Sequence, residues 1–149
     1  MINSIGVHIK VKDFKTSVAF YKALGFKKIF EYGPDKEVKE KYNGMTFGHG
    51  DSRLEIADGH IAVSPKTFQE TVQSAKISLM VNVDSIKTIM DKCAKAKIPL
   101  AVGPKHYYWG TIEIVVRDPD GVIIVFICPY SKEEEKKVFA KEVLQMKPW

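Results

Sequence analysis

The expected order of secondary structure repeats once along this chain, and this repeat constrains the fold more than any other feature. The first half reads strand, helix, strand, strand, strand. β-Branched residues dominate 4–11, and Phe14, Val18 and Tyr21 then recur at helical spacing. Three further strand segments follow at 26–32, 45–49 and 53–57. After a polar linker over 59–75, the same order returns.

The second half begins with a strand over 77–83 and a helix that Asp84 can cap. The apolar stripe of this helix comprises Ile86, Ile89, Met90 and Cys93. Three more strands are expected at 100–103, 111–116 and 122–127. The tail opens with the capping box Ser131-x-x-Glu134 and predicts a third helix with a weak stripe of Phe139, Val143 and Met146.

These patterns predict an α+β fold in a single domain over 1–149. It consists of two tandem βαβββ modules, at about 5–59 and 76–129, whose curved sheets form a cleft, and a C-terminal helical extension over 131–149. Cys93 and Cys128 form no CxxC pair, and both are expected to be buried thiols.

The net charge of +5 raises the question of a nucleic-acid partner. Arginine occurs only at Arg53 and Arg117, and the lysines are interleaved with Asp and Glu, which predicts a solvated surface and no nucleic-acid partner. No apolar run is long enough to span a bilayer, and the N-terminus lacks the features of a signal peptide. We therefore expect a cytoplasmic protein with no membrane partner.

Three local sequence motifs, or phrases, resemble those of a known family. The first comprises Val11-Lys-Asp13, Ser17-Val-Ala-Phe-Tyr21 and Leu24-Gly-Phe26. The second is Asp118-Pro-Asp-Gly121, which precedes an apolar strand, and the third is Trp109-Gly110 followed by Glu113. Over about residues 5–129 the chain resembles the vicinal oxygen chelate superfamily of glyoxalases, bleomycin resistance proteins and extradiol dioxygenases. The third phrase is similar to the bleomycin-resistance branch. The resemblance implies a homodimer, since such relatives commonly build each pocket from two chains.

Metal-dependent members hold a divalent ion with one His, Glu or Gln from each of four inner strands. Alignment through the shared phrases places Gly6, Glu55, Ser78 and Val125 at these positions. Only Glu55 can ligate, whereas a catalytic metal needs about three protein ligands. The resemblance therefore implies no metal cofactor.

His8 leaves an alternative open. It stands two residues after Gly6 and so shares the same strand face. It is either a displaced metal ligand, acting with His49 and Glu55, or a hydrogen-bonded histidine in a cleft or at a strand end. A shift of two residues in the alignment would also restore a metal site.

The expected ligand-binding residues are His8, Phe47, His49, Glu55 and Trp109. Phe47 and His49 are two residues apart and so share one strand face. Trp109 ends the aromatic run from His106, which we expect in a loop, either as part of a pocket or as a structural cluster at a barrel end or subunit interface.

The function predicted from these residues is a metal-free small-molecule-binding protein that sequesters a small aromatic or apolar ligand, as drug-binding relatives do. One alternative is a metal-dependent glyoxalase-like lyase or isomerase, or a dioxygenase, that uses Glu55 with His8 and His49. Another is an interaction module that docks through its tail helix.

Overall fold

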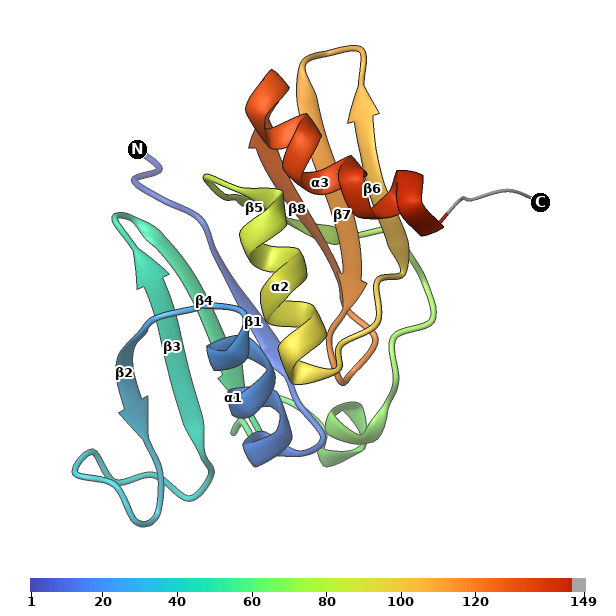
Figure 1. Cartoon of the computed structure of the whole chain (residues 1–149). Helices are drawn as coiled ribbons and strands as arrows, with labels where there is room; N and C mark the ends of the chain where they lie inside the picture. Colours follow the sequence, from blue (N-terminus) through green and yellow to red (C-terminus); the bar gives the residue numbers. More distant parts are fainter. Residues whose placement is uncertain (146–149) are drawn as a thin grey trace. The chain divides into compact units, whose positions relative to one another are not determined.

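The computed structural model describes the backbone of residues 1–145 and the side chains of residues 1–140. The chain divides into two compact units, with the boundary between Val72 and Gln73, and each is described by itself (Figure 1). Each unit contains one four-stranded sheet. Among the helices of the described residues, none is long and apolar enough to cross a membrane.

The first unit contains one βαβββ module with a sheet in the order β1-β4-β3-β2. β1 is parallel to β4, and the other pairs are antiparallel. A short 3-10 helix, Pro65–Gln69, follows the module and buries Phe68. The elements are β1 (Gly6–Lys10), α1 (Phe14–Ala23), β2 (Lys28–Tyr32), β3 (Gly44–His49) and β4 (Ser52–Ala57).

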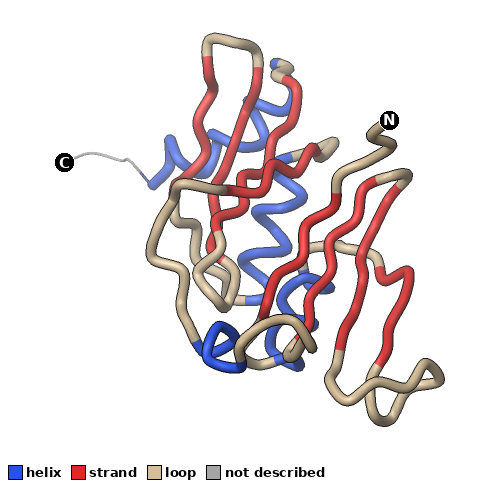
Figure 2. Tube along the Cα trace, turned by 180° about the vertical axis from the view of Figure 1, so that it is seen from behind, coloured by secondary structure: helices blue, strands red, loops and turns tan. Residues whose placement is uncertain are grey.

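One face of this sheet packs against α1 and forms the core of the unit. Asp13 caps the start of the helix, because its side chain accepts a hydrogen bond of 3.0 Å from the Thr16 amide. On the inner side of the helix, Tyr21 is fully buried and its ring lies 5.7 Å from that of Phe47. The opposite face of the sheet carries no helix of this unit, which leaves it available for a binding site (Figure 2).

The second unit repeats the module with the sheet order β5-β8-β7-β6, again with its first two strands parallel. The repeat confirms the predicted α+β fold of two βαβββ modules and a C-terminal helix. The elements are β5 (Ser78–Asn82), α2 (Ile86–Ala96), β6 (Val102–Tyr107), β7 (Thr111–Arg117), β8 (Ile123–Pro129) and α3 (Lys132–Gln145).

Two local predictions in this unit were wrong. Ser85, not Asp84, caps α2, since its hydroxyl accepts from the Thr88 amide at 3.2 Å. β6 extends through Tyr107, so half of the aromatic run expected in a loop belongs to a strand paired with β7.

The tail helix α3 is an integral part of the second unit. Ser131 caps it as the capping box predicts, with its hydroxyl accepting from the Glu134 amide at 3.0 Å. Val138 is fully buried and Glu134 is 7% exposed. Of the predicted apolar stripe, Met146 lies outside the described residues, as does the side chain of Val143.

Candidate functional site

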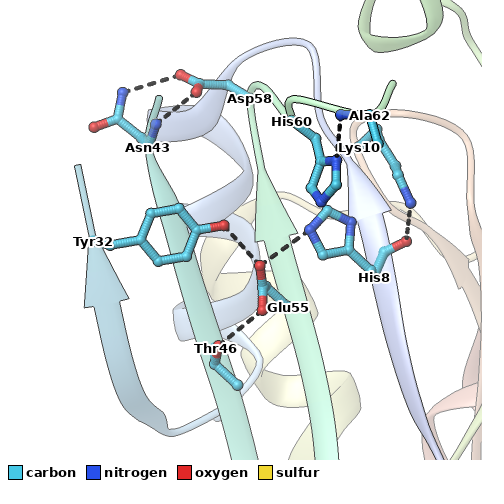
Figure 3. A network of polar contacts seen from close by, with 9 residues as sticks. All are labelled: His8, Lys10, Tyr32, Asn43, Thr46, Glu55, Asp58, His60 and Ala62. Atoms are coloured by element: carbon cyan, nitrogen blue, oxygen red, sulfur yellow. Dashed lines mark hydrogen bonds and ion pairs between the residues drawn. The ribbon is translucent and has the colours of Figure 1, made fainter. Parts of the chain in front are cut away.

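The helix-free face of the first sheet brings His8 and Glu55 together. The two residues are direct neighbours in the parallel pairing of β1 and β4, and Thr46 and Phe30 continue the same row across β3 and β2. Residues paired across strands share a face of the sheet. Tyr32 stands in the adjoining row, so four strands contribute to one polar surface (Figure 3).

Glu55 is the centre of the polar contacts in this surface. Its Oε2 atom accepts a 2.7 Å hydrogen bond from the Tyr32 hydroxyl and lies 3.0 Å from Nε2 of His8. Its Oε1 atom accepts from the Thr46 hydroxyl at 3.5 Å. Both ring nitrogens of His8 are buried, yet neither forms a well-aligned hydrogen bond with any described residue. His8 and Glu55 are therefore in close contact, and this contact is an ion pair only when the imidazole is protonated.

Aromatic contacts complete a closed ring of side chains around this centre. The His8 ring lies 5.8 Å from that of His60, His60 lies 6.4 Å from Tyr42, and Tyr42 lies 6.1 Å from Tyr32. Tyr32 also contacts Glu55, and Glu55 contacts His8, which closes the set of contacts. We call these five side chains the site ring: His8, His60, Tyr42, Tyr32 and Glu55. They border an open cavity of about 450 Å³ that is also lined by Phe30, Val38 and Glu40. This volume lies in the range typical of small-molecule sites.

Two glycines make room for the aromatic walls of the cavity. A Cβ atom on Gly44 would lie 2.0 Å from the Tyr32 ring, and one on Gly59 would lie 2.6 Å from Cβ of Tyr42. Asp58 fixes the end of the loop before β3 by accepting from the Asn43 amide and side chain at 2.8 and 3.0 Å. The positions of both tyrosines are thus set by the backbone before any ligand arrives.

Burial governs the charge state of the site. Desolvation lowers the pKa of His8 below its ordinary value of 6.5, and Lys10 and His60 add to this, while the nearby Glu55 carboxylate opposes it. Burial and the hydrogen bond to Glu55 raise the pKa of Tyr32, so its phenol stays protonated. At neutral pH the site therefore holds a neutral imidazole and a neutral phenol beside a carboxylate.

The lowered pKa of His8 predicts a loss of stability in mild acid. The unfolded chain binds a proton at this residue near pH 6.5, before the folded chain does. The free energy of unfolding should therefore fall as the pH drops below about 6.5 and be restored above it. NMR titration of the imidazole signals measures this directly. We expect Glu55→Gln to lower the pKa of His8 further, and a wild-type midpoint at or above 6.5 would contradict the assignment.

The structure separates the residues that the sequence grouped into one pocket. Phe47 lies on the helix-covered face, 1% exposed, paired with Leu54, so its place in the pocket is corrected. His49 shares the face of Phe47, as expected, but is exposed at the end of β3, and it too does not line the cavity. Of the predicted residues in this unit, only His8 and Glu55 line it.

The remaining cavity residues were missed. His60 was expected to be a solvated linker residue, but its ring belongs to the site ring, with Nδ1 accepting from the Ala62 amide at 3.0 Å. Tyr32 and Tyr42 flank a charged loop and belong to no sequence motif that would have marked them as site residues. The only available signal was that Tyr32 falls near the end of a strand expected to pair within the same sheet.

Trp109 belongs to the second unit and is 55% exposed at the turn between β6 and β7. Its ring stacks on Tyr107, with centroids 4.4 Å apart and planes 9° apart. Its indole N–H donates to Glu113 Oε2 at 3.1 Å, and the Thr111 hydroxyl donates to the same oxygen at 2.6 Å. Glu113 therefore orients the indole, which presents an exposed aromatic surface.

The strand register relates the centres of the two modules to each other. His8 pairs with Glu55 at the centre of β1, and Met80 pairs with Val125 at the centre of β5. His8 and Met80 therefore hold equivalent places in the two modules. Of these four residues, His8 and Glu55 can ligate a metal ion, whereas Met80 and Val125 offer no hard ligand.

A catalytic divalent ion does not fit these residues. No group of three or more His, Cys, Asp or Glu side chains capable of holding a metal occurs within the described residues. His8 and Glu55 supply two donors, and Glu55 already accepts from Tyr32 and Thr46. Typical catalytic sites use about three protein ligands and an open position.

Comparison with known proteins places this geometry in a family. The family model of the glyoxalase/bleomycin resistance protein/dioxygenase superfamily matches residues 2–126. No curated protein matches the chain by sequence.

Solved structures share the fold at low identity. A fosfomycin resistance protein, FosX, from Listeria monocytogenes, complexed with Mn(II) and 1S,2S-dihydroxypropylphosphonic acid, has a TM-score of 0.67 at 13% identity, covering 92% of this chain and 99% of that one. A hypothetical protein from S. aureus has a TM-score of 0.62 at 20% identity, covering 86% and 95%. A glyoxalase/bleomycin resistance protein/dioxygenase from Nocardioides has a TM-score of 0.64 at 16% identity, covering 89% and 86%. With the family model spanning most of the sequence, the chain belongs to the glyoxalase/bleomycin resistance protein/dioxygenase superfamily, that is, the vicinal oxygen chelate superfamily.

Proposed function

We propose that this protein binds a small molecule with aromatic or apolar surface in the first-unit cavity, without a metal ion. The observation that carries the proposal is the site ring itself: a carboxylate, an imidazole with unused nitrogens and two tyrosines border a cavity of about 450 Å³. Sites of this kind combine apolar and aromatic walls with a few fixed polar groups. Trp109 remains a proposed ligand-binding residue of the second unit, through its exposed ring.

The donor set supports binding without a metal. Tyr32, Thr46 and His8 already surround the Glu55 carboxylate, which stabilises it without a cation. The equivalent centre of the second module is Met80 and Val125.

Metal analysis together with ligand screening tests the proposal. Purified protein should retain no stoichiometric transition metal after dialysis, and added Mn²⁺, Ni²⁺ or Zn²⁺ should not raise Tm. A panel of neutral and charged aromatic compounds should yield hits whose NMR shifts map to Phe30, Tyr32 and Tyr42. Tyr42→Leu should weaken these hits, whereas Tyr108→Leu, which removes an exposed tyrosine of the second unit, should not. If no compound of the panel bound, the proposal would be contradicted.

A metal-dependent enzyme is the second candidate, favoured by the 3.0 Å pairing of His8 and Glu55 on adjacent strands and by the Mn(II) in the FosX structure. It requires a third donor that the described residues do not group with these two. One tightly bound metal per chain, lost in both His8→Ala and Glu55→Gln, would establish it in place of metal-free binding.

We also propose a homodimer. β1 and β5 are edge strands of their sheets, and apolar side chains near them are exposed: Ile5 (81%), Ile77 (79%) and Met80 (72%). Burying such surface contributes about 25 cal/mol per Å². Sedimentation velocity at micromolar concentration should give a dimer that Met80→Lys weakens. A wild-type monomer under these conditions would contradict the proposal.

A further inference from the structure

We infer that the first-unit cavity selects an organic cation, such as a quaternary or protonated amine with alkyl or aromatic substituents. This inference rests on the proposed function and adds the charge of the ligand. It follows from the aromatic rings and the carboxylates that line the cavity, both of which favour a positive group.

The walls offer aromatic faces to a cation. Phe30, Tyr32 and Tyr42 line the cavity, and Tyr32 lies 6.2 Å from Phe30 and 6.1 Å from Tyr42. The two ring pairs meet at 46° and 80°, so the faces point in different directions around the space. Rings arranged in this way attract a cation through the negative potential of their faces, and such cages are a common means of binding quaternary ammonium groups.

The charges of the lining have the same sign. Glu40 and Glu55 are the carboxylates of the cavity, and no lysine or arginine lines it. The imidazole of His8 is held neutral by its lowered pKa, so it does not cancel them at neutral pH. The nearby Lys10 directs its ammonium to the backbone oxygen of His8 at 3.4 Å. Lys39 donates to the Pro34 carbonyl at 3.3 Å, and neither of these residues lines the cavity.

The selection is local, because the chain as a whole carries a net charge of +5. Long-range attraction of a cation is therefore absent, and screening limits charge effects to about 8 Å at physiological salt. Binding must depend on contact with Glu40, Glu55 and the aromatic faces. An anion or a neutral molecule of the same shape lacks both the charge attraction to the two carboxylates and the cation attraction to the aromatic faces.

Three isosteric probes separate charge from shape: choline, its neutral analogue 3,3-dimethyl-1-butanol, and the anion 3,3-dimethylbutyrate. Each is titrated into the full chain at constant ionic strength and followed by NMR shifts of residues around the cavity. We expect choline to bind at least tenfold more tightly than the neutral analogue, and the anion not to bind. Equal or weaker binding of choline, or no shift near the cavity, would overturn the inference.

Charge-removing variants test the source of the selectivity. Glu55→Gln should lower the preference for choline over the alcohol at least tenfold, and Glu133→Gln, which alters an exposed glutamate of α3, should leave this preference unchanged. Because Glu55 holds the site ring together, Glu40→Gln on the exposed loop provides a second variant, expected to weaken choline by at least threefold. If both cavity variants bind choline like wild type, the inference is wrong. If neutral aromatic compounds still bound in the cavity, the proposed function would stand without the selection for cations. If no such compound bound either, the proposed function and the inference would both be contradicted.

Discussion

Replacing Phe47 by Ala should lower the free energy of unfolding by about 3–5 kcal/mol. Phe47 is 1% exposed, and its ring lies 5.7 Å from Tyr21 and 6.1 Å from Phe26. The substitution leaves a cavity between α1 and the sheet that rigid neighbours fill only in part. Urea denaturation followed by circular dichroism measures the loss.

Trp109→Ala is the matched control, since Trp109 is 55% exposed and makes one side-chain hydrogen bond, to Glu113. It should change the free energy of unfolding by less than about 1 kcal/mol. The two variants together distinguish core from surface aromatic residues. If Phe47→Ala lost little stability but bound ligand more weakly, Phe47 would have to be assigned to the binding pocket.

The case of Phe47 shows what alternation in a strand can predict. A period of two establishes that Phe47 and His49 share a face of β3, and the structure agrees. It does not say which face meets the helix. That choice depends on the partner strands, where Phe47 pairs with Leu54 and Thr46 pairs with Glu55. Thr46 was the residue of β3 that belonged with the site.

The fold was predictable because its determinants are local. Helical spacing of apolar residues located α1 and α2, and Asp13 and Ser131 cap helices as their side-chain chemistry predicts. The errors occurred where neighbouring residues offered equivalent signals, such as Asp84 beside Ser85. The choice between the two depends on Glu134, which lies far along the chain and contacts Ser85.

The site was only partly predictable, because its residues come together through long-range pairing. His8 and Glu55 were found because the family alignment placed Glu55 at a ligand position and strand alternation placed His8 on the same face as Gly6, but their direct pairing depends on the register of β1 against β4. Tyr42 and His60 lie outside the strands. Their positions depend on the contact of Asp58 with Asn43 and on the space at Gly59, neither of which has a sequence pattern.

Glu134→Ala should lower the free energy of unfolding by about 2–3 kcal/mol. The Glu134 carboxylate is buried, and its Oε1 atom accepts from the Ser85 hydroxyl and from the Lys87 amide, both at 2.9 Å. The tail helix thereby caps the first turn of α2, where free amides favour a negative charge. Removing the carboxylate leaves the partly buried Lys87 amide without this acceptor.

This role of Glu134 argues against a tail helix that is free to dock elsewhere. Glu133→Ala, one residue away and exposed, is the control and should cost less than about 0.5 kcal/mol. Glu134→Gln should fall between the two, because its amide oxygen can still accept both hydrogen bonds but carries no charge. Hydrogen exchange adds a local measure: the Lys87 amide should lose protection in Glu134→Ala and keep it in Glu133→Ala. If the two alanine variants were equally stable and equally protected, α3 would be a dispensable appendage, and a docking role for it would regain support.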